Sequence, residues 1–182
     1  MISSNVVFLR LLVCTLAFLC FSNSYADEKK IIFLLDIYCL RTEVDTKLME
    51  KMLAAADAKK VPPEFMNQSP AMAGNGGIAY ILKENNKKYM IAATYGGGCT
   101  VMGSAIPSLL ESAVKRNYRL KHFADDDSGV QVEKMWFIDK GSRYSGGMIS
   151  LTFPKDEFSS GDVITLSYVP ENIVQKMIDN NR

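Results

Sequence analysis

The segment that decides the class of fold is Ile78-Ala79-Tyr80-Ile81-Leu82-Lys83-Glu84-Asn85-Asn86-Lys87-Lys88-Tyr89-Met90-Ile91-Ala92-Ala93-Thr94-Tyr95. Two largely apolar runs, 78–83 and 88–95, flank the polar sequence Glu84-Asn85-Asn86-Lys87. Asparagine tolerates the positive φ angles that tight hairpin turns require. The segment therefore predicts two antiparallel strands joined by a short turn.

More strands are predicted after this hairpin. Three glycines, 96–98, precede a short strand at Cys99-Thr100-Val101-Met102. Beyond residue 117 the chain resembles a meander, because apolar runs alternate with polar turns that contain glycine. The expected strands of this meander lie near residues 118–124, 130–138, 147–153 and 162–169.

Two helices are predicted before the hairpin. Residues 29–41 form a long apolar run without alternation, which favours a helix with Cys39 on its apolar side. In the helix that follows, apolar residues recur at spacings of three and four, and Asp45 or Thr42 could cap its first turn.

Two further helices complete the pattern. Ser104 is expected to cap a helix over residues 105–117, and Pro170 is expected to open the last helix of the chain. The predicted fold class is α+β, an antiparallel sheet of about six to seven strands covered by N-terminal, middle and C-terminal helices. No linker or internal repeat divides residues 27–182, so they are expected to form a single domain.

The first 26 residues have the features of a cleavable export signal. Arg10 is their only charged residue, and the apolar run 11–21 follows it directly. The small residues Ser24 and Ala26 then fit a small-x-small cleavage pattern. Cleavage after Ala26 would leave 156 of the 182 residues. We expect the mature chain in the periplasm, with secretion from the cell as the alternative.

Two other interpretations of this N-terminal segment are a buried helix and a membrane or lipid anchor. Eleven helical residues rise only about 16 Å, roughly half of a bilayer's hydrocarbon core, so no span is expected after signal cleavage. Lipoprotein signals place a small residue before the modified cysteine, whereas Val13 and Leu19 precede Cys14 and Cys20. Both cysteines are therefore read as apolar residues of the signal.

The mature chain retains two cysteines, Cys39 and Cys99. An even number of cysteines in a small exported domain is most simply a disulfide. The alternative is a redox-active or metal-binding pair, but the chain has no C-x-x-C spacing and no histidine near either cysteine.

Charge excludes one class of partner. The whole chain has 21 Lys and Arg residues and 20 Asp and Glu residues, and removal of Arg10 with the signal leaves a net charge of zero. A basic field for nucleic acid is therefore absent, and no nucleic-acid partner is expected.

Two glycine-rich turns are the candidate binding segments. In Tyr95-Gly96-Gly97-Gly98-Cys99 the glycines would allow the backbone to approach a ligand or another chain closely, or would merely form a bend before the disulfide. In Arg143-Tyr144-Ser145-Gly146-Gly147 an arginine stands beside a tyrosine, two residues favoured at protein interfaces, although an ordinary turn is the simpler interpretation. The candidate binding residues are Tyr95, Gly97, Arg143 and Tyr144.

No catalytic, metal or cofactor site is predicted. His122 is the only histidine, which argues against zinc sites and, without a G-x-S-x-G motif, against a serine hydrolase. The run Asp125-Asp126-Asp127-Ser128-Gly129 lacks the EF-hand spacing and is expected to be a solvated turn. Met49 and Met52 could bind Cu(I), but they lie on the apolar stripe of a predicted helix and are expected in the core.

The order of these features resembles that of a group of short, uncharacterised exported proteins and lipoproteins of Gram-negative bacteria. The resemblance covers about residues 31–138. It rests on the cysteine-bearing first helix, the strand that begins Gly76-Gly77-Ile78-Ala79-Tyr80, and the element Gly98-Cys99-Thr100-Val101. It implies a periplasmic location and supports the pairing of Cys39 with Cys99, and it implies no activity.

Three functions remain open from the sequence. The first is a non-catalytic binding or interaction protein of the cell envelope, such as an inhibitor or an immunity protein that masks a toxin. The second is a hydrolase acting on cell-wall material, since glycosidases need only two carboxylates. The third is a metal-handling protein that uses methionines.

Overall fold

The computed structural model describes residues 27–66, 76–155 and 163–180. The predicted signal, residues 1–26, lies outside this part of the chain. Within it, no helix combines the length and apolar character needed to cross a bilayer.

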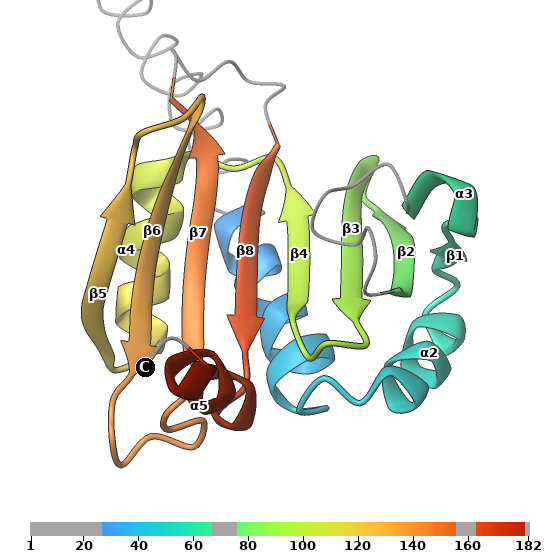
Figure 1. The fold of residues 1–182 in the computed structure, drawn as a ribbon. Helices are drawn as coiled ribbons and strands as arrows, with labels where there is room; N and C mark the ends of the chain where they lie inside the picture. The colour runs from blue at the N-terminus through green and yellow to red at the C-terminus, as the bar shows by residue number, and fades with distance from the viewer. Residues whose placement is uncertain (1–26, 67–75, 156–162, 181–182) are drawn as a thin grey trace, which may run out of the picture.

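One antiparallel sheet of eight strands organises the fold (Figure 1). The predicted α+β class is confirmed, and all seven strands expected from the sequence are present. The eighth, β1, is a two-residue edge strand that the sequence did not indicate. In chain order the strands are β1 (Lys59–Lys60), β2 (Gly77–Glu84), β3 (Lys87–Thr94), β4 (Cys99–Gly103), β5 (Leu120–Asp126), β6 (Gln131–Ile138), β7 (Met148–Pro154) and β8 (Ile164–Val169).

The sheet joins two meanders. Its strand order is β1-β2-β3-β4-β8-β7-β6-β5, so the last strand of the second meander pairs with the last strand of the first. Cys99 of β4 lies opposite Tyr168 of β8 in this pairing. The β2–β3 turn consists of Asn85 and Asn86, both with positive φ, as the sequence predicted.

The helices lie on one face, near one edge and at one end of the sheet. Residues 27–34 are α-helical and continue as the π-helix η1 (Leu35–Leu40), and this N-terminal helix lies behind the sheet beside α4 (Pro107–Asn117) in Figure 1. The helices α2 (Thr46–Ala55) and α3 (Pro63–Met66) lie near the β1 edge. The last helix, α5 (Glu171–Asn180), lies at the lower end of β7 and β8.

Alternation along the strands separates the two faces of the sheet. In β8, Ile164, Leu166 and Tyr168 are buried in the main core, while Thr165 and Ser167 face the other side. Apolar side chains of the N-terminal helix and of α4 belong to the same core. This period-two pattern is what places the main hydrophobic core between the sheet and the two helices.

One predicted helix cap is correct and the other is wrong. Asp45 caps α2, because its carboxylate accepts hydrogen bonds from the amides of Lys47 (2.9 Å) and Leu48 (3.1 Å). Ser104 does not cap α4. The N-cap residue of that helix is Ile106, whose amide donates to the carboxylate of Glu28 at 3.1 Å.

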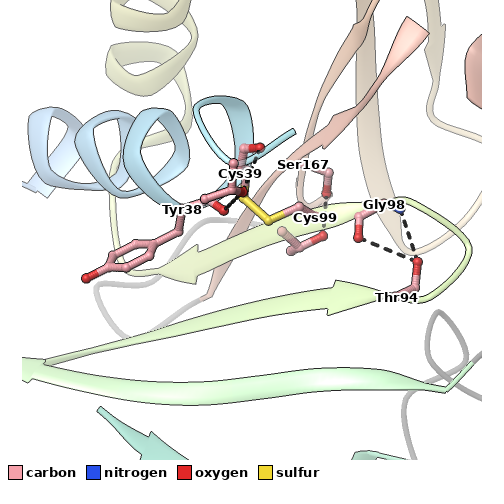
Figure 2. Close-up of a disulfide and its surroundings, with 8 residues drawn as sticks. Tyr38, Cys39, Thr94, Gly98, Cys99 and Ser167 are labelled. Atoms are coloured by element: carbon pink, nitrogen blue, oxygen red, sulfur yellow. Dashed lines mark hydrogen bonds between the residues drawn. A yellow bond between two sulfur atoms is a disulfide. The ribbon is translucent and has the colours of Figure 1, made fainter. Parts of the chain in front are cut away.

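A disulfide between Cys39 and Cys99 ties the N-terminal helix to β4 (Figure 2). The two Cα atoms lie 5.5 Å apart, within the range that a disulfide spans, and both residues are buried. The pairing expected from the sequence is therefore present. It holds the N-terminal helix against the centre of the sheet, next to the β4–β8 junction.

Candidate functional site

A pocket of about 310 Å³, here called the α5 pocket, lies at the end of the sheet where α5 begins. Three separate parts of the chain form it: the turn between η1 and α2, the β6–β7 loop, and the residues that lead from β8 into α5. Its lining includes Glu43, Arg143, Tyr144, Tyr168, Glu171 and Asn172.

The β6–β7 loop brings Arg143 and Tyr144 to this pocket. The loop closes on itself through a hydrogen bond from the amide of Gly147 to the carbonyl of Tyr144 (3.2 Å), and Gly146 has a φ of 81°. Arg143 is exposed whereas Tyr144 is half-buried. The loop therefore presents a guanidinium group at the rim of the pocket and a tyrosine ring in its wall.

Both glycine-rich turns lie against α5. A Cβ atom built at Gly146 would lie 2.4 Å from Cδ of Glu171, and one built at Gly97 would lie 2.6 Å from Cγ1 of Ile173. An added Cβ would have to displace the side chain of Ile173 at Gly97 and the end of the flexible Glu171 side chain at Gly146. Both glycines also have a positive φ, so glycine is the residue that suits both positions. The structure thus brings the two candidate segments of the sequence to one helix.

The four candidate binding residues take different places around α5. Arg143 and Tyr144 line the pocket, and Gly97 supports the first turn of α5. Tyr95 does not line the pocket. Its side chain is 67% exposed, and its ring lies beside Gly76, where a Cβ would come within 3.0 Å of it.

The turn that contains Tyr95 and Gly97 is a closed, hydrogen-bonded turn (Figure 2). The amide of Gly98 donates to Oγ1 of Thr94 (3.1 Å), as Figure 2 shows. The amide of Thr94 also donates to the carbonyl of Gly98 (2.9 Å). This turn leads directly into Cys99, so the disulfide fixes the end of the segment on which α5 rests.

Tyr144 belongs to a polar and aromatic network. Its hydroxyl group donates to Oδ1 of Asp36 at 3.3 Å, and Nε of Arg41 donates to Oδ2 of the same carboxylate at 2.7 Å. Its ring meets that of Tyr168 edge to face, with 6.4 Å between centroids, and the guanidinium group of Arg143 lies 5.6 Å from its centroid. These contacts fix the tyrosine that forms the pocket wall.

Two carboxylates, those of Glu43 and Glu171, lie near the side chain of Tyr168 in the lining of the α5 pocket. Burial raises the pKa of Tyr168 to about 12, and the negative charges of Glu43 and Glu171 act in the same direction. Glu43 and Val44 both have positive φ angles, 51° and 61°. Such a conformation is rare for a β-branched residue like Val44, so the turn that carries Glu43 is strained.

Raising the pH above 10 is expected to lower the free energy of unfolding, in part through Tyr168. Its pKa is 10.0 when unperturbed and about 12 in the folded protein. The contribution of Tyr168 to the free energy of unfolding is therefore fully present below pH 10. It is lost as the pH rises towards 12, because the unfolded chain releases the phenolic proton first. The loss from this residue is on the order of 2 kcal/mol.

Urea unfolding at pH 9, 10 and 11, followed by circular dichroism, measures this dependence. The variant Tyr168→Phe keeps the ring and has no proton to release, so its stability should fall less steeply over the same range. Equal pH dependence in the two proteins would show that Tyr168 has an ordinary pKa.

A second pocket, of about 360 Å³, lies between the N-terminal helix and the end of α4. Asp36 lines this pocket and also accepts the hydrogen bond from Tyr144, so the same carboxylate connects it with the α5 pocket. Phe33, also in its lining, is 51% exposed. The two pockets and the network between them form one continuous region of aromatic and charged side chains.

The other candidates from the sequence lie elsewhere. His122 is exposed on β5, where Nε2 lies 3.0 Å from a carboxylate oxygen of Asp125. Met49 is fully buried and Met52 packs against the core. In the described residues, no group of three or more histidine, cysteine, aspartate and glutamate side chains is arranged to hold a metal ion.

The sequence did not indicate Glu43, Tyr168, Glu171 or Asn172 as site residues. They come from two distant parts of the chain, residue 43 and residues 168–172, and no local motif connects them. Comparisons of the chain with protein-family models, with curated proteins and with solved structures found no match.

Proposed function

We propose that this chain is an exported, disulfide-bonded binding protein that recognises a protein partner of the cell envelope through the α5 pocket. The observation that carries the proposal is the convergence of two glycine-rich turns on α5, around a pocket with Arg143 at its rim and Tyr144 in its wall. Arginine and tyrosine dominate the binding energy of many protein interfaces.

Exposed apolar side chains on α5 support the proposal that the partner is a protein. On α5, Met177 is 51% exposed and Ile178 is 39% exposed. Among the apolar residues of α5, which are Ile173, Val174, Met177 and Ile178, only Val174 is buried. Exposed apolar side chains on a helix whose first residues line a polar, aromatic pocket are consistent with an interface that combines apolar and polar contacts.

Export rests on the N-terminal pattern and is compatible with the disulfide. The charge, apolar run and small residues of residues 1–26 fit a signal that is cleaved after Ala26. Disulfides persist in the periplasm and outside the cell, and they are rare in the cytosol. An inhibitor or immunity protein would need a stable, tightly held surface of this kind.

Affinity capture from envelope extract tests the proposal. The mature protein should retain a specific partner at physiological salt, and Arg143→Ala and Asn172→Ala should each weaken its binding about tenfold or more. Both side chains are exposed, so the two substitutions are expected to leave the fold intact.

The matched control is Val130→Ala. Val130 is 84% exposed in the β5–β6 turn, at the end of the sheet opposite α5, and its substitution should leave binding unchanged. Failure to capture any specific partner would contradict the proposal. So would a partner that Arg143→Ala, Asn172→Ala and Val130→Ala all bind as tightly as the unmodified protein.

A hydrolase acting on cell-wall material is the second candidate, because Glu43 and Glu171 both line the α5 pocket. Glycosidases act through two carboxyl groups that flank the scissile bond. Release of soluble fragments from purified peptidoglycan, lost in both Glu43→Gln and Glu171→Gln, would favour this function over binding alone. No release by the unmodified protein would eliminate it.

A further inference from the structure

Glu28 is the most unusual ionisable residue among those described. It is only 1% exposed, and the single hydrogen bond that its carboxylate receives from another residue comes from the amide of Ile106, at 3.1 Å on Oε1. The other oxygen, Oε2, is buried without a hydrogen-bond partner. A buried carboxylate with an unsatisfied oxygen destabilises a fold unless a positive charge or a donor reaches it.

The position of Glu28 in the chain indicates what could reach it. Glu28 is the second residue after the predicted cleavage point, so removal of residues 1–26 creates a charged α-ammonium group on Asp27, directly before it. We propose that the carboxylate of Glu28 binds the α-ammonium group of Asp27 and so anchors the mature amino terminus in the fold. This inference rests on the proposed export and cleavage.

The local geometry brings the new group within reach. The backbone amide of Glu28 already faces its own carboxylate, and amides in the first turn of a helix all point towards its N-terminus. The backbone nitrogen of Asp27 is therefore next to the backbone nitrogen of Glu28, which the Glu28 carboxylate already contacts.

Other contacts hold Asp27 in place. Its side-chain carboxylate accepts hydrogen bonds from the ammonium group of Lys87 and, at 3.2 Å, from the hydroxyl group of Tyr89. The first residue of the mature chain is thus fastened to β3, which restricts where its α-nitrogen can lie.

The charges around Glu28 favour an added cation. Burial raises the pKa of the Glu28 carboxyl group, and the neighbouring Asp27 carboxylate raises it further. The amides of Ile106 and Glu28 and the charge of Lys87 act in the opposite direction without cancelling the effect. A cation at the α-nitrogen would pair with both carboxylates and stabilise the ionised form of Glu28.

The expected change in stability has the opposite sign to the usual effect of a positive charge at a helix N-terminus. A positive charge at the N-terminus of a helix normally destabilises it, because the helix dipole is positive there. If Glu28 binds the ammonium group, the chain that begins at Asp27 is instead more stable than one in which the charge is moved away.

The test compares two purified chains, one that begins at Asp27 and one that retains Tyr25 and Ala26 before it. The chain that begins at Asp27 is expected to have a Tm higher by about 4–8 °C. Glu28→Gln should abolish or reverse this difference. Acylation of the α-amine at pH 7 should also be at least about tenfold slower in the unmodified folded protein than in Glu28→Gln, which supplies a second measurement if the variant unfolds easily.

The outcomes separate this inference from the proposed export. The N-terminus of the protein from its producing cells is read by mass spectrometry. A start other than Asp27 would contradict the proposed cleavage and the inference with it. A start at Asp27, with equal Tm values for the two chains and equal amine reactivity with and without Glu28, would overturn the inference alone.

Discussion

Replacing Cys39 and Cys99 together by alanine is expected to lower the free energy of unfolding by about 4 kcal/mol. The disulfide joins residues that are 60 positions apart, and its loss gives the unfolded chain the conformational freedom of that long loop. For a chain of this size the corresponding fall in Tm is about 8–16 °C. Few other changes should destabilise the protein as much.

Thermal unfolding of three proteins measures this effect. The single variant Cys39→Ala should lose nearly as much stability as the double variant, because either change removes the bond. The unmodified protein in excess reductant should approach the same Tm. A loss below about 1 kcal/mol in the double variant would show that the bond does not restrict the unfolded chain as the loop model requires.

Gly97→Ala is expected to destabilise the protein by about 3 kcal/mol and to weaken partner binding. Gly97 has a φ of 99°, a conformation that side chains rarely adopt, and the added Cβ would lie 2.6 Å from Cγ1 of Ile173. Backbone strain and overpacking each cost about 1–3 kcal/mol. Because Ile173 is branched and stiff, the strain is expected to be relieved by movement of α5 rather than by rotation of one side chain.

Gly98→Ala is the matched control in the same turn. Gly98 does not have a positive φ, and a Cβ built there would meet only Oγ1 of Thr94, at 3.6 Å. Its Tm and its partner binding should remain close to those of the unmodified protein. If Gly97→Ala were as stable as Gly98→Ala, close packing between this turn and α5 would not be needed for the α5 pocket.

Most of the fold could be predicted because its signals are local. The Asn85-Asn86 turn requires two residues that tolerate positive φ, and both have it. Alternation identifies a strand such as β8 within its own six residues. Asp45 caps α2 through amides two and three positions further on, so the sequence alone could indicate it.

The errors arise where the deciding contact is distant in the sequence. β1 is only Lys59–Lys60, and it is a strand because its backbone pairs with β2, which no composition reveals. Ser104 looks like a cap, yet the nearby amide of Ile106 is bound by Glu28, 78 residues earlier. A contact across that separation leaves no local pattern.

The candidate site was predictable only in part, for the same reason. The glycine-rich sequence 143–147 predicted Arg143 and Tyr144 as binding residues, and both line the α5 pocket. Glu43 and Glu171 join them only through tertiary packing. That α5 lies against Gly97 and Gly146 depends on the registers of β4 and β7 with β8, which the sequence does not specify.

An intact mass of the protein isolated from its producing cells, recorded with and without alkylation of free thiols, tests the central claim most directly. The account predicts a chain that begins at Asp27 and takes up no alkylating reagent, because its two cysteines form one disulfide. A chain that still begins at Met1 and is alkylated at Cys39 and Cys99 would contradict it.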